Sequence, residues 1–452
     1  MGTMIETLQY CTLSNWLYSI PESCPSAEYA SLDAVLLDDL IERVMEPVVI
    51  QDDEIYTRLT IKTGGAGAQV RRKGGVPERI CGKEIGRKNQ FRVHRGQLVV
   101  SSIDARNGGA GIVPEEAEGS VVTDNFWVFT VKDNKVVPSF LQLLLSRPGV
   151  LSQIEAISHG TTNRQYITID QFLKVRVTLP EMPEQKRFLI QYKRLQDRVT
   201  KLQAAINSFG DRCETVIKTL VGMTDDSSET TKGTLFTVAY QDLYKWNSGE
   251  AKQIAPSSST MRMKDCIAEL MTRGGKSLRV TPQKTPAKRF HYVGMENVEK
   301  RLGLLTDKPL EATGQDIKSA SVAVPKGYVI YGKLRPYLNK YWLNERYQGD
   351  VICSSEFLVF RPSEIVDLHY FLAILGSDYI QKQISGKLSG TRMPRLSTSG
   401  FLDLEVPFPS MDIQEQIGEE CLQIQKEVDG NRKKLKKLRG FETEKLFDKY
   451  GI

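Results

Sequence analysis

Two stretches of the chain place apolar residues three and four positions apart in alternation, which is the pattern of a long helix that pairs with another helix. In the first stretch these positions are Leu189, Tyr192, Leu195, Val199, Leu202, Ile206, Phe209, Cys213, Val216 and Leu220. In the second they are Ile417, Cys421, Ile424, Val428, Asn431, Leu435 and Leu438. Helices of about 35–40 residues would be on the order of 55 Å long, too long to bury such a stripe inside one domain of this size. We therefore expect the two helices to pair as an antiparallel coiled coil.

The second stripe contains residues that are unusual in a continuous coiled coil. Asn431 is a polar residue on the stripe, where it can fix the register of pairing at some cost in stability. Gly430 and Gly440 weaken the prediction of an unbroken helix, because glycine disfavours the helix interior. The basic run 432–437 falls mostly off the stripe and is expected to be solvated.

The segments that precede the two helices are rich in β-branched and aromatic runs separated by turn residues, which predicts strands. The runs are QLVVSSI, SVVTDNFWVFTV and KVRVTL before the first helix, and YVIYGKL, DVICSSEFLVF and LDLEVPF before the second. The sequence therefore predicts an α+β fold: two mixed α/β domains, each with a substantial sheet, joined by the two long helices.

The same order of landmarks occurs twice, at a period of about 230 residues. Matching landmarks include Tyr10, Leu13 and Trp16 with Tyr240, Leu243 and Trp246, Gly96 with Gly327, and Phe126, Val128 and Phe129 with Phe357, Val359 and Phe360. This period is far longer than that of a solenoid repeat, so it indicates a duplicated domain together with its trailing helix, related by a pseudo-twofold axis. Trp16 and Trp246 are expected to be core anchors of the two domains.

Each predicted helix begins after the same local motif. A short strand is followed by a proline and then by Glu-Gln, as VTLPEMPEQ at 177–185 and VPFPSMDIQEQ at 406–416. Aligned on Glu-Gln, the second copy carries two extra residues. The expected boundaries are a first domain at 1–180, its helix at 181–222, a linker at 223–235, a second domain at 236–408 and its helix at 409–450.

Composition and charge add few constraints. The 452 residues are 40% hydrophobic and 26% charged, which is ordinary for a soluble protein of two or three domains. A net charge of +6 permits a polyanionic partner without requiring one. No stretch approaches the roughly 18 apolar residues of a membrane span, and the N-terminus lacks an export signal, so a cytoplasmic protein is expected. The seven cysteines show no metal-ligand spacing, which favours reduced, mostly buried thiols and no metal site.

With its two motif copies, each preceded by a Gly-Thr turn and followed by a heptad helix, the chain resembles the specificity (S) subunits of type I restriction-modification enzymes over nearly its whole length. This resemblance implies two target-recognition domains, each recognising one half of a bipartite double-stranded DNA site, and a helix pair that sets the distance between the halves. Because the two copies differ greatly in their polar loops, it implies an asymmetric target.

The resemblance also implies partners and the location of catalysis. Two methyltransferase subunits would dock on this chain, together with restriction and translocase subunits where the system has them, and no membrane would be involved. S-adenosylmethionine, Mg and ATP would be bound by those partners and no cofactor by this chain. A role in defence against foreign DNA follows from the same resemblance.

Several basic and amide-rich loops carry the side-chain types that recognise bases and phosphates. The candidate DNA-binding residues are Arg71, Arg72, Lys73, Arg106, Asn107, Asn163, Arg164 and Gln165 in the first domain and Arg273, Lys276, Lys333, Arg335, Asn339, Arg392 and Arg395 in the second. Arg106 and Arg335 each follow an apolar strand, so we expect them to present equivalent side chains at the edge of the sheet. The alternative, that any of these is an ordinary solvated residue, stays open.

No arrangement of residues predicts catalysis. The Gly-rich stretch at 64–69 lacks the Gly-Lys-Ser/Thr ending of a nucleotide-binding loop, and the Asn/Asp-Pro-Pro-Tyr/Phe motif of adenine methylation is absent. The sequence indicates no Ser or Cys nucleophile that would pair with any of the histidines, which are His94, His159, His291 and His369. The expected function is therefore non-catalytic DNA recognition. The alternatives are a DNA-modifying enzyme with an unrecognised active site, or a protein scaffold that does not recognise bases.

Overall fold

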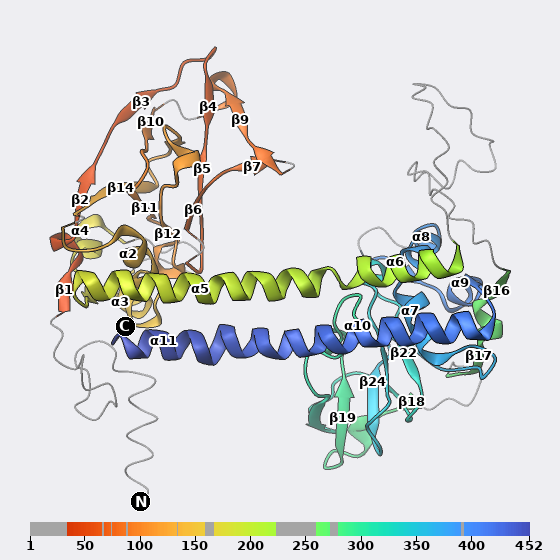
Figure 1. Ribbon diagram of the computed structural model, residues 1–452. Helices are drawn as coiled ribbons and strands as arrows, with labels where there is room; N and C mark the ends of the chain where they lie inside the picture. The colour runs from red at the N-terminus through yellow and green to blue at the C-terminus, as the bar shows by residue number, and fades with distance from the viewer. Residues whose placement is uncertain are drawn as a thin grey trace, which may run out of the picture. The chain divides into compact units, whose positions relative to one another are not determined.

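The computed structural model describes residues 34–65, 67–73, 75–86, 89–132, 134–158, 167–222, 259–271, 279–389 and 393–452. Its contacts divide the chain into two compact units (Figure 1). The first holds Met1–Val199 with Lys437–Ile452, and the second holds Thr200–Lys436. Each unit therefore contains one of the predicted domains and parts of both long helices. The landmarks before residue 34 and at 240–246, including Trp16 and Trp246, lie outside the described residues.

The core of the first unit is an antiparallel sheet with apolar residues on both faces. Its order is β12 (Ala110–Ile112), β11 (Leu98–Ser101), β14 (Phe126–Val131) and β2 (Ile41–Val44). Along β11, Leu98 and Val100 contribute to one apolar cluster while Val99 contributes to another, as the alternation of a strand requires. The helices that cover the first face are α2 (Pro138–Leu144), α3 (Pro148–Ala156) and α4 (Ile169–Leu173).

The remaining strands of this unit form one smaller sheet and several two-stranded ribbons. The smaller sheet has the order β13 (Val121–Val122), β10 (Asn89–Arg92), β3 (Pro47–Val49). The ribbons are β1 (Ala34–Leu36) with β15 (Arg176–Thr178), β4 (Ile55–Thr57) with β9 (Arg79–Cys81), β5 (Leu59–Lys62) with β6 (Gly67–Val70), and β7 (Arg72–Lys73) with β8 (Val76–Pro77). The last three ribbons all arise from the segment between β3 and β10.

The second unit repeats this frame. Its four-stranded sheet has the matching order β23 (Tyr341–Leu343), β22 (Val329–Gly332), β25 (Phe357–Pro362), β17 (Ile267–Leu270). The other sheet has the order β18 (Arg279–Val280), β21 (Ser321–Ala323), β24 (Val351–Ser354), β19 (Arg289–Val293), β20 (Leu310–Thr313). The ribbons are β16 (Thr260–Arg262) with β28 (Glu405–Pro407) and β26 (Leu388–Ser389) with β27 (Arg395–Leu396). The helices of this domain are α7 (Leu368–Gly376), α8 (Asp378–Ser385) and α9 (Thr398–Leu402).

The duplication predicted from sequence is therefore confirmed in the backbone. Gly96 and Gly327, which were matched by sequence, both adopt left-handed conformations, with φ of 83° and 84°, two residues before the starts of β11 and β22. The α+β fold class is confirmed as well. The two copies differ in the segment between their matched strands: the first folds it into three ribbons, whereas the second folds it into β19 and β20.

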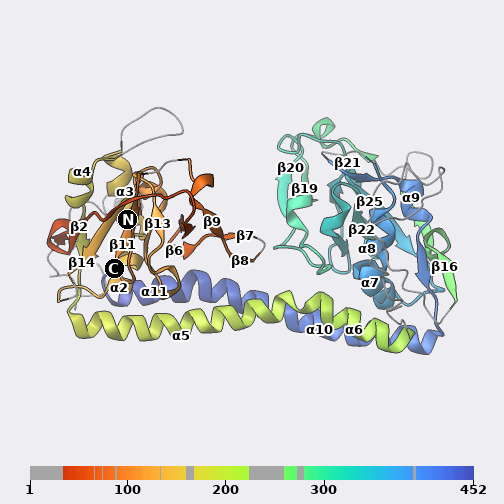
Figure 2. The same ribbon diagram turned by 90° about the horizontal axis from the view of Figure 1, so that it is seen from above.

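The two long helices begin at Met182 and Met411. The first comprises α5 (Met182–Asn207) and α6 (Phe209–Val221), and the second comprises α10 (Met411–Lys437), a π-helical turn at Leu438–Glu442, and α11 (Thr443–Lys449). In the first unit α5 and α11 lie side by side in both views (Figures 1 and 2). The Gln191 amide donates to the Tyr450 hydroxyl at 2.8 Å, and Arg198 lies 3.5 Å from Glu442, so the two helices run in opposite directions there. The packing of a coiled coil remains a prediction.

The buried stripe shifts by one residue in the last part of each helix. In α6 the buried side chains are Ile217 and Val221, whereas Val216 and Leu220, which were predicted, are only half-buried. A break at Ser208, whose ψ is 0°, separates α5 from α6. The shift begins further along the chain, because Phe209 and Cys213 after the break are still buried as predicted. In the second helix the π turn adds a residue to one turn and exposes Phe441, so the stripe resumes at Phe447 and Tyr450.

These last segments are anchored to domain cores. In the first unit the Phe188 ring lies 5.1 Å from that of Phe447 and 5.4 Å from that of Tyr450, and it meets Phe140 of α2 edge to face at 5.4 Å. The two helices also end alike, because each is followed by a glycine in the left-handed region, Gly222 and Gly451.

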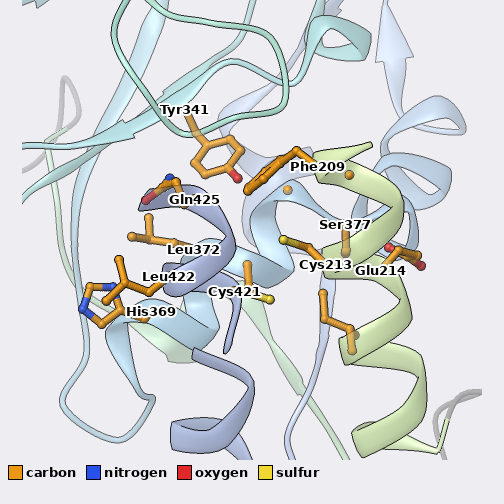
Figure 3. A pocket seen from close by; sticks show the side chains of 14 residues that line it. Phe209, Cys213, Glu214, Tyr341, His369, Leu372, Ser377, Cys421, Leu422 and Gln425 are labelled. Atoms are coloured by element: carbon orange, nitrogen blue, oxygen red, sulfur yellow. The ribbon is translucent and has the colours of Figure 1, made fainter. Parts of the chain in front are cut away.

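In the second unit α6 packs against α7 and α10 around a small cavity (Figure 3). The side chains of Cys213 and Cys421 line it from facing helices. The Glu214 carboxylate also lines it and accepts a hydrogen bond from the Asp378 backbone N–H at 3.0 Å. Burial raises the pKa of Glu214, because the charged form loses its hydration there.

A buried glutamine near the start of each long helix explains the sequence motif. Gln185 is 0% exposed; its amide N–H groups donate to the Pro180 carbonyl at 2.9 Å and the Lys135 carbonyl at 3.3 Å, and its carbonyl accepts from the Val137 N–H at 2.9 Å. Val137 is the residue that precedes α2. One side chain thus joins the end of a strand, the start of the long helix and the start of a domain helix.

The second copy has the same arrangement at Gln414, not at Gln416. Gln414 is 1% exposed, donates to the Pro409 carbonyl at 2.9 Å and accepts from the Asp367 N–H, which precedes α7, at 3.0 Å. Gln416 is exposed and bonds Glu420 on its own helix. The alignment on Glu-Gln is therefore wrong: the second copy has no extra residues, because both glutamines lie five positions after their proline.

Replacement of either buried glutamine by leucine should destabilise the protein by about 2 kcal/mol, because buried backbone groups lose their partners. We expect Gln185→Leu and Gln414→Leu to lower the midpoint of urea unfolding. Gln416→Leu is the matched control and should change stability by no more than about 0.5 kcal/mol. Equal effects at all three positions would show that burial of the glutamine has no structural role.

Candidate nucleic-acid interface

Three of the predicted residues of the second domain come together at one end of its four-stranded sheet. The turn after β22 carries Lys333 and Arg335, and Arg395 lies in β27. Backbone hydrogen bonds connect these segments: the Arg335 N–H donates to the Pro394 carbonyl at 2.8 Å, and the Leu396 N–H donates to the Lys333 carbonyl at 3.0 Å. Two loops that are distant in sequence therefore form one basic surface.

Arg335 is held in an unfavourable backbone conformation. Its φ of 48° and ψ of 57° lie in the left-handed region, which costs a residue other than glycine about 1–2 kcal/mol. Pro336 follows it and disfavours the right-handed helical region for Arg335. The side chain is exposed, and no acidic group in the described part of the chain pairs with it. Such strain persists where the surroundings determine the turn, and it is common at functional sites.

Arg395 and Asn339 differ from Arg335 in their surroundings. Arg395 pairs with Glu356 at 3.0 Å and is half-exposed. Asn339 is 0% exposed, and its amide donates to the Gly376 carbonyl at the end of α7 at 3.0 Å. The Asn339 amide is buried and already bonded, so it cannot reach a base edge of DNA. The expectation that Asn339 binds DNA is therefore wrong, and its role is to hold the turn.

In the first domain the corresponding turn follows β11. The Ser102 N–H donates to the Asn125 carbonyl at 2.9 Å, just as the Lys333 N–H donates to the Glu356 carbonyl at 2.8 Å. Each turn continues into a 3-10 helix, Ala105–Asn107 or Pro336–Leu338, and then into a left-handed residue, Gly108 or Asn339.

This matching corrects one expectation. Arg106 is the middle residue of its 3-10 helix, so its counterpart is Tyr337; the counterpart of Arg335 is Asp104. Arg106 and Arg335 are not equivalent. Arg106 is also half-buried, in a turn that packs against α3, whereas Asn107 is exposed. The sequence alignment missed this relation because it matched two arginines instead of the backbone turn around them.

The β7–β8 ribbon carries the other basic group of the first domain. Arg71, Arg72 and Lys73 are all exposed. Arg72 lies 3.1 Å from Glu116, and Arg71 lies 3.2 Å from Glu78. Glu78 also bonds Arg58, and this bond lowers the pKa of the Glu78 carboxyl. A two-stranded ribbon has the width to enter a DNA major groove, and half-exposed ion pairs of this kind can exchange a carboxylate for a phosphate at little cost.

The β5–β6 ribbon and the turn after β11 adjoin one another. The Gly64 N–H, in the turn between β5 and β6, donates to the Asn107 carbonyl at 2.8 Å. The remaining candidates, Asn163, Arg164, Gln165, Arg273, Lys276 and Arg392, lie outside the described residues.

One polar hollow in the second domain was missed by sequence reasoning. Arg289 and His291 of β19 line it, together with Glu311, Gln348 and Asp350. Lys288 lies 2.7 Å from Asp350 at its edge. Arginine, histidine and glutamine are side chains that bond base edges, and the signal that could have revealed them is the alternation of Arg289 and His291 on one strand face.

His94 lies between two glutamates on the first domain. Its Nδ1 is 2.6 Å from Glu118 and its Nε2 is 2.7 Å from Glu46. The bond to Glu118 and then that to Glu46 raise the pKa of His94, because both carboxylates favour the charged imidazolium. The Arg95 backbone N–H and His94 together lower the pKa of Glu118. This cluster connects the segments before β3 and after β10, and it provides no nucleophile.

In the described part of the chain, no group of three or more His, Cys, Asp or Glu side chains is placed to hold a metal ion. No helix there has the length and apolar character to cross a membrane. The five cysteines within it are free thiols, and four of them are buried.

A family model for the type I restriction modification DNA specificity domain matches the chain twice, at residues 52–208 and 291–439. The chain belongs to this family. Both matches end within the long helices, so a specificity domain here comprises a sheet domain and much of its trailing helix. The resemblance inferred from sequence is confirmed. No curated relative matches the chain.

Two solved structures are similar in fold to the whole chain. One comes from work on the assembly and conformational transition of a type I R-M system; it is 14% identical, with a TM-score of 0.50, and the match covers 96% of this chain and 99% of that one. The other is the type I restriction-modification S subunit from M. genitalium, which is also 14% identical with a TM-score of 0.50, over 93% of this chain and 96% of its own. At this identity the likeness concerns the fold of the specificity domains and their helices alone.

The stabilisation that His94 provides should depend on pH. Its raised pKa means that the contribution is fully present below about pH 6 and is lost as pH rises through the pKa of the folded state. We expect His94→Gln to destabilise the protein at about pH 6 and to have less effect at about pH 9, measured by urea unfolding. His369→Gln is the control, because His369 contacts no carboxylate in the described part of the chain. An effect of His94→Gln that does not vary with pH would exclude this role.

Two substitutions of Arg335 should differ in their effect on stability and agree in their effect on DNA binding. Arg335→Gly should be more stable than Arg335→Ala by about 1 kcal/mol, because only glycine adopts the left-handed conformation without cost. Both variants should lose about tenfold in affinity for the cognate DNA, since both lack the guanidinium. Unfolding and DNA titration of the two variants test this. Full affinity in Arg335→Gly would mean that Arg335 is a solvated surface residue.

Proposed function

We propose that this chain recognises an asymmetric, bipartite DNA site for a type I restriction-modification complex and is not itself a catalyst. The observation that carries the proposal is the duplicated specificity domain. Its first copy presents exposed cationic side chains on the β7–β8 ribbon, and its second copy presents them on the turn after β22 and on β27. Cations and amides at such edges are the groups that bind phosphates and base edges.

The asymmetry of the site follows from how the two copies differ. Their four-stranded sheets have the same order, so each domain holds its loops on an equivalent frame. The loops themselves are unlike: a basic ribbon in the first copy, and a strained turn with a polar hollow in the second. Because different loops are held on equivalent sheets, the two domains are expected to recognise two different half-sites.

The helices supply the spacing between the half-sites. Two recognition elements that meet one side of a duplex must lie about one helical turn, roughly 34 Å, apart or a multiple of that. Each long helix begins in one compact unit and ends in the other. The length of these helices would therefore set the number of base pairs between the two half-sites.

Methylation and cleavage are assigned to partner subunits. The sequence lacks the adenine-methylation motif, and the chain carries two specificity domains. We propose that two methyltransferase subunits dock on it, with restriction and translocase subunits where the system has them. S-adenosylmethionine, Mg and ATP would be bound by those subunits. One of the similar structures comes from work on assembly of such a system.

A direct test combines co-expression with the methyltransferase and mapping of methylated adenines in the genome. We expect one split, asymmetric motif. Exchange of residues 1–180 for those of a relative should change one half of the motif and leave the other half and the spacer unchanged.

Other results would favour the alternatives. Metal-dependent nicking by the isolated chain, abolished by a single carboxylate substitution, would indicate an enzyme. Binding without sequence preference in the complex would indicate a scaffold.

A further inference from the structure

The turn after β22 exposes two large apolar side chains beside its arginine. Tyr337 is 55% exposed and Met393 is 52% exposed. We refer to Arg335, Tyr337 and Met393 as the Tyr337 patch. Scattered exposed apolar residues are ordinary, but a tyrosine and a methionine grouped next to a strained, exposed arginine indicate a contact surface.

Backbone contacts hold the patch together. The bond from the Arg335 N–H to the Pro394 carbonyl, at 2.8 Å, lies two residues from Tyr337 and one from Met393. Pro336 and Asn339 on either side of Tyr337 are buried, and the Leu338 N–H donates to the Arg335 carbonyl at 2.9 Å. Tyr337 therefore stands on a short turn whose base is buried, so ordering it on binding costs little conformational entropy.

More than half of the surface of Tyr337 stays exposed. No other aromatic ring and no cation of those residues lies over Tyr337, unlike the partly buried Tyr347, which lies 6.0 Å from His291 and 6.2 Å from Trp342. The surroundings are cationic, since Lys333 and Arg395 belong to the adjoining segments. An apolar group inside a cationic surface fits a partner that is anionic outside and offers an apolar group within, which is the composition of a DNA major groove.

We propose that the Tyr337 patch contacts a thymine methyl group in the second half-site, while Arg335 bonds a neighbouring guanine. This inference rests on the proposed function. The thymine 5-methyl is the apolar group that the major groove presents, and guanine N7 and O6 are the acceptors that arginine bonds in pairs. Tyr337 and Met393 would cover the methyl, so the second half-site would contain an A·T pair next to a G·C pair.

The corresponding turn of the first domain makes this contact specific to one half-site. There the position of Tyr337 is occupied by Arg106, and the left-handed residue after it is a glycine. Corresponding turns thus carry a half-buried cation in the first copy and an exposed aromatic ring in the second. Equivalent turns would then select different bases in the two half-sites.

The test uses the complex with its methyltransferase and duplexes that carry the motif mapped for the wild type. Each thymine of the second half-site is replaced in turn by deoxyuridine, which removes only the methyl group. We expect one replacement to weaken wild-type binding about fourfold, the effect of one buried methyl. Tyr337→Ala should weaken binding to the unmodified duplex by a similar factor and should be insensitive to that replacement.

Two control variants accompany Tyr337→Ala. Tyr337→Phe keeps the ring and should bind like the wild type. Leu310→Ala removes an equally exposed apolar side chain from β20 of the same domain and should leave affinity unchanged. All of these side chains are exposed, so the free energy of unfolding should not change by more than about 0.5 kcal/mol.

Four results would overturn the inference while leaving the proposed function intact. They are a second half-site without thymine in either strand, unchanged affinity in Tyr337→Ala, a loss in Tyr337→Ala that persists equally on every deoxyuridine duplex, and a loss of methyltransferase from the complex instead of a loss of DNA affinity. If the wild-type complex protects no specific sequence, the proposed function itself fails.

Discussion

The structure depends on the hydrogen bonds that a buried glutamine makes near the start of each long helix. Gln185 and Gln414 each join the proline after a strand to the residue before a domain helix. Because three elements share one amide, the direction in which the long helix leaves its domain is determined locally, before any contact with the other helix. A buried amide without these partners would be costly, so the arrangement tolerates little variation.

Anchoring at both ends requires the helices to depart from a regular heptad. An undistorted stripe would place positions 216 and 220 in the buried face of α6, yet Ile217 and Val221 are buried there. In α6 the stripe advances by one residue after Cys213. In the second helix the π turn at Leu438–Glu442 adds a residue to one turn, which rotates the last segment so that Phe447 and Tyr450 join a domain core. Exposure of Phe441 accompanies that rotation. The irregularities thus allow one helix to pack against the other long helix and also against a domain core.

Sequence reasoning predicted what depends on periodicity and failed where it depended on matching residue types. The duplication and the sheets follow from patterns that persist over many residues. The equivalence of Arg106 with Arg335, and that of the two Glu-Gln pairs, came from matching identical letters, whereas the backbone pairs Arg106 with Tyr337 and Gln185 with Gln414. Asn339 resembled a base-binding side chain in the sequence, but its burial is visible only when α7 is present beside it. Local composition cannot distinguish a polar residue that supports a turn from one that the turn presents.

This distinction bears on how such a protein changes its target. The buried residues of the turn after β22, Pro336 and Asn339, hold its shape, whereas Arg335 and Tyr337 project from a backbone that they do not stabilise. Arg335 even weakens the fold through its left-handed conformation. Exposed positions of this kind can be substituted without loss of the domain, and the first copy shows a different solution on the same turn, with Asp104 and Arg106. A frame held by buried amides and prolines therefore separates folding from recognition, so that the two copies can keep one architecture while their DNA contacts diverge.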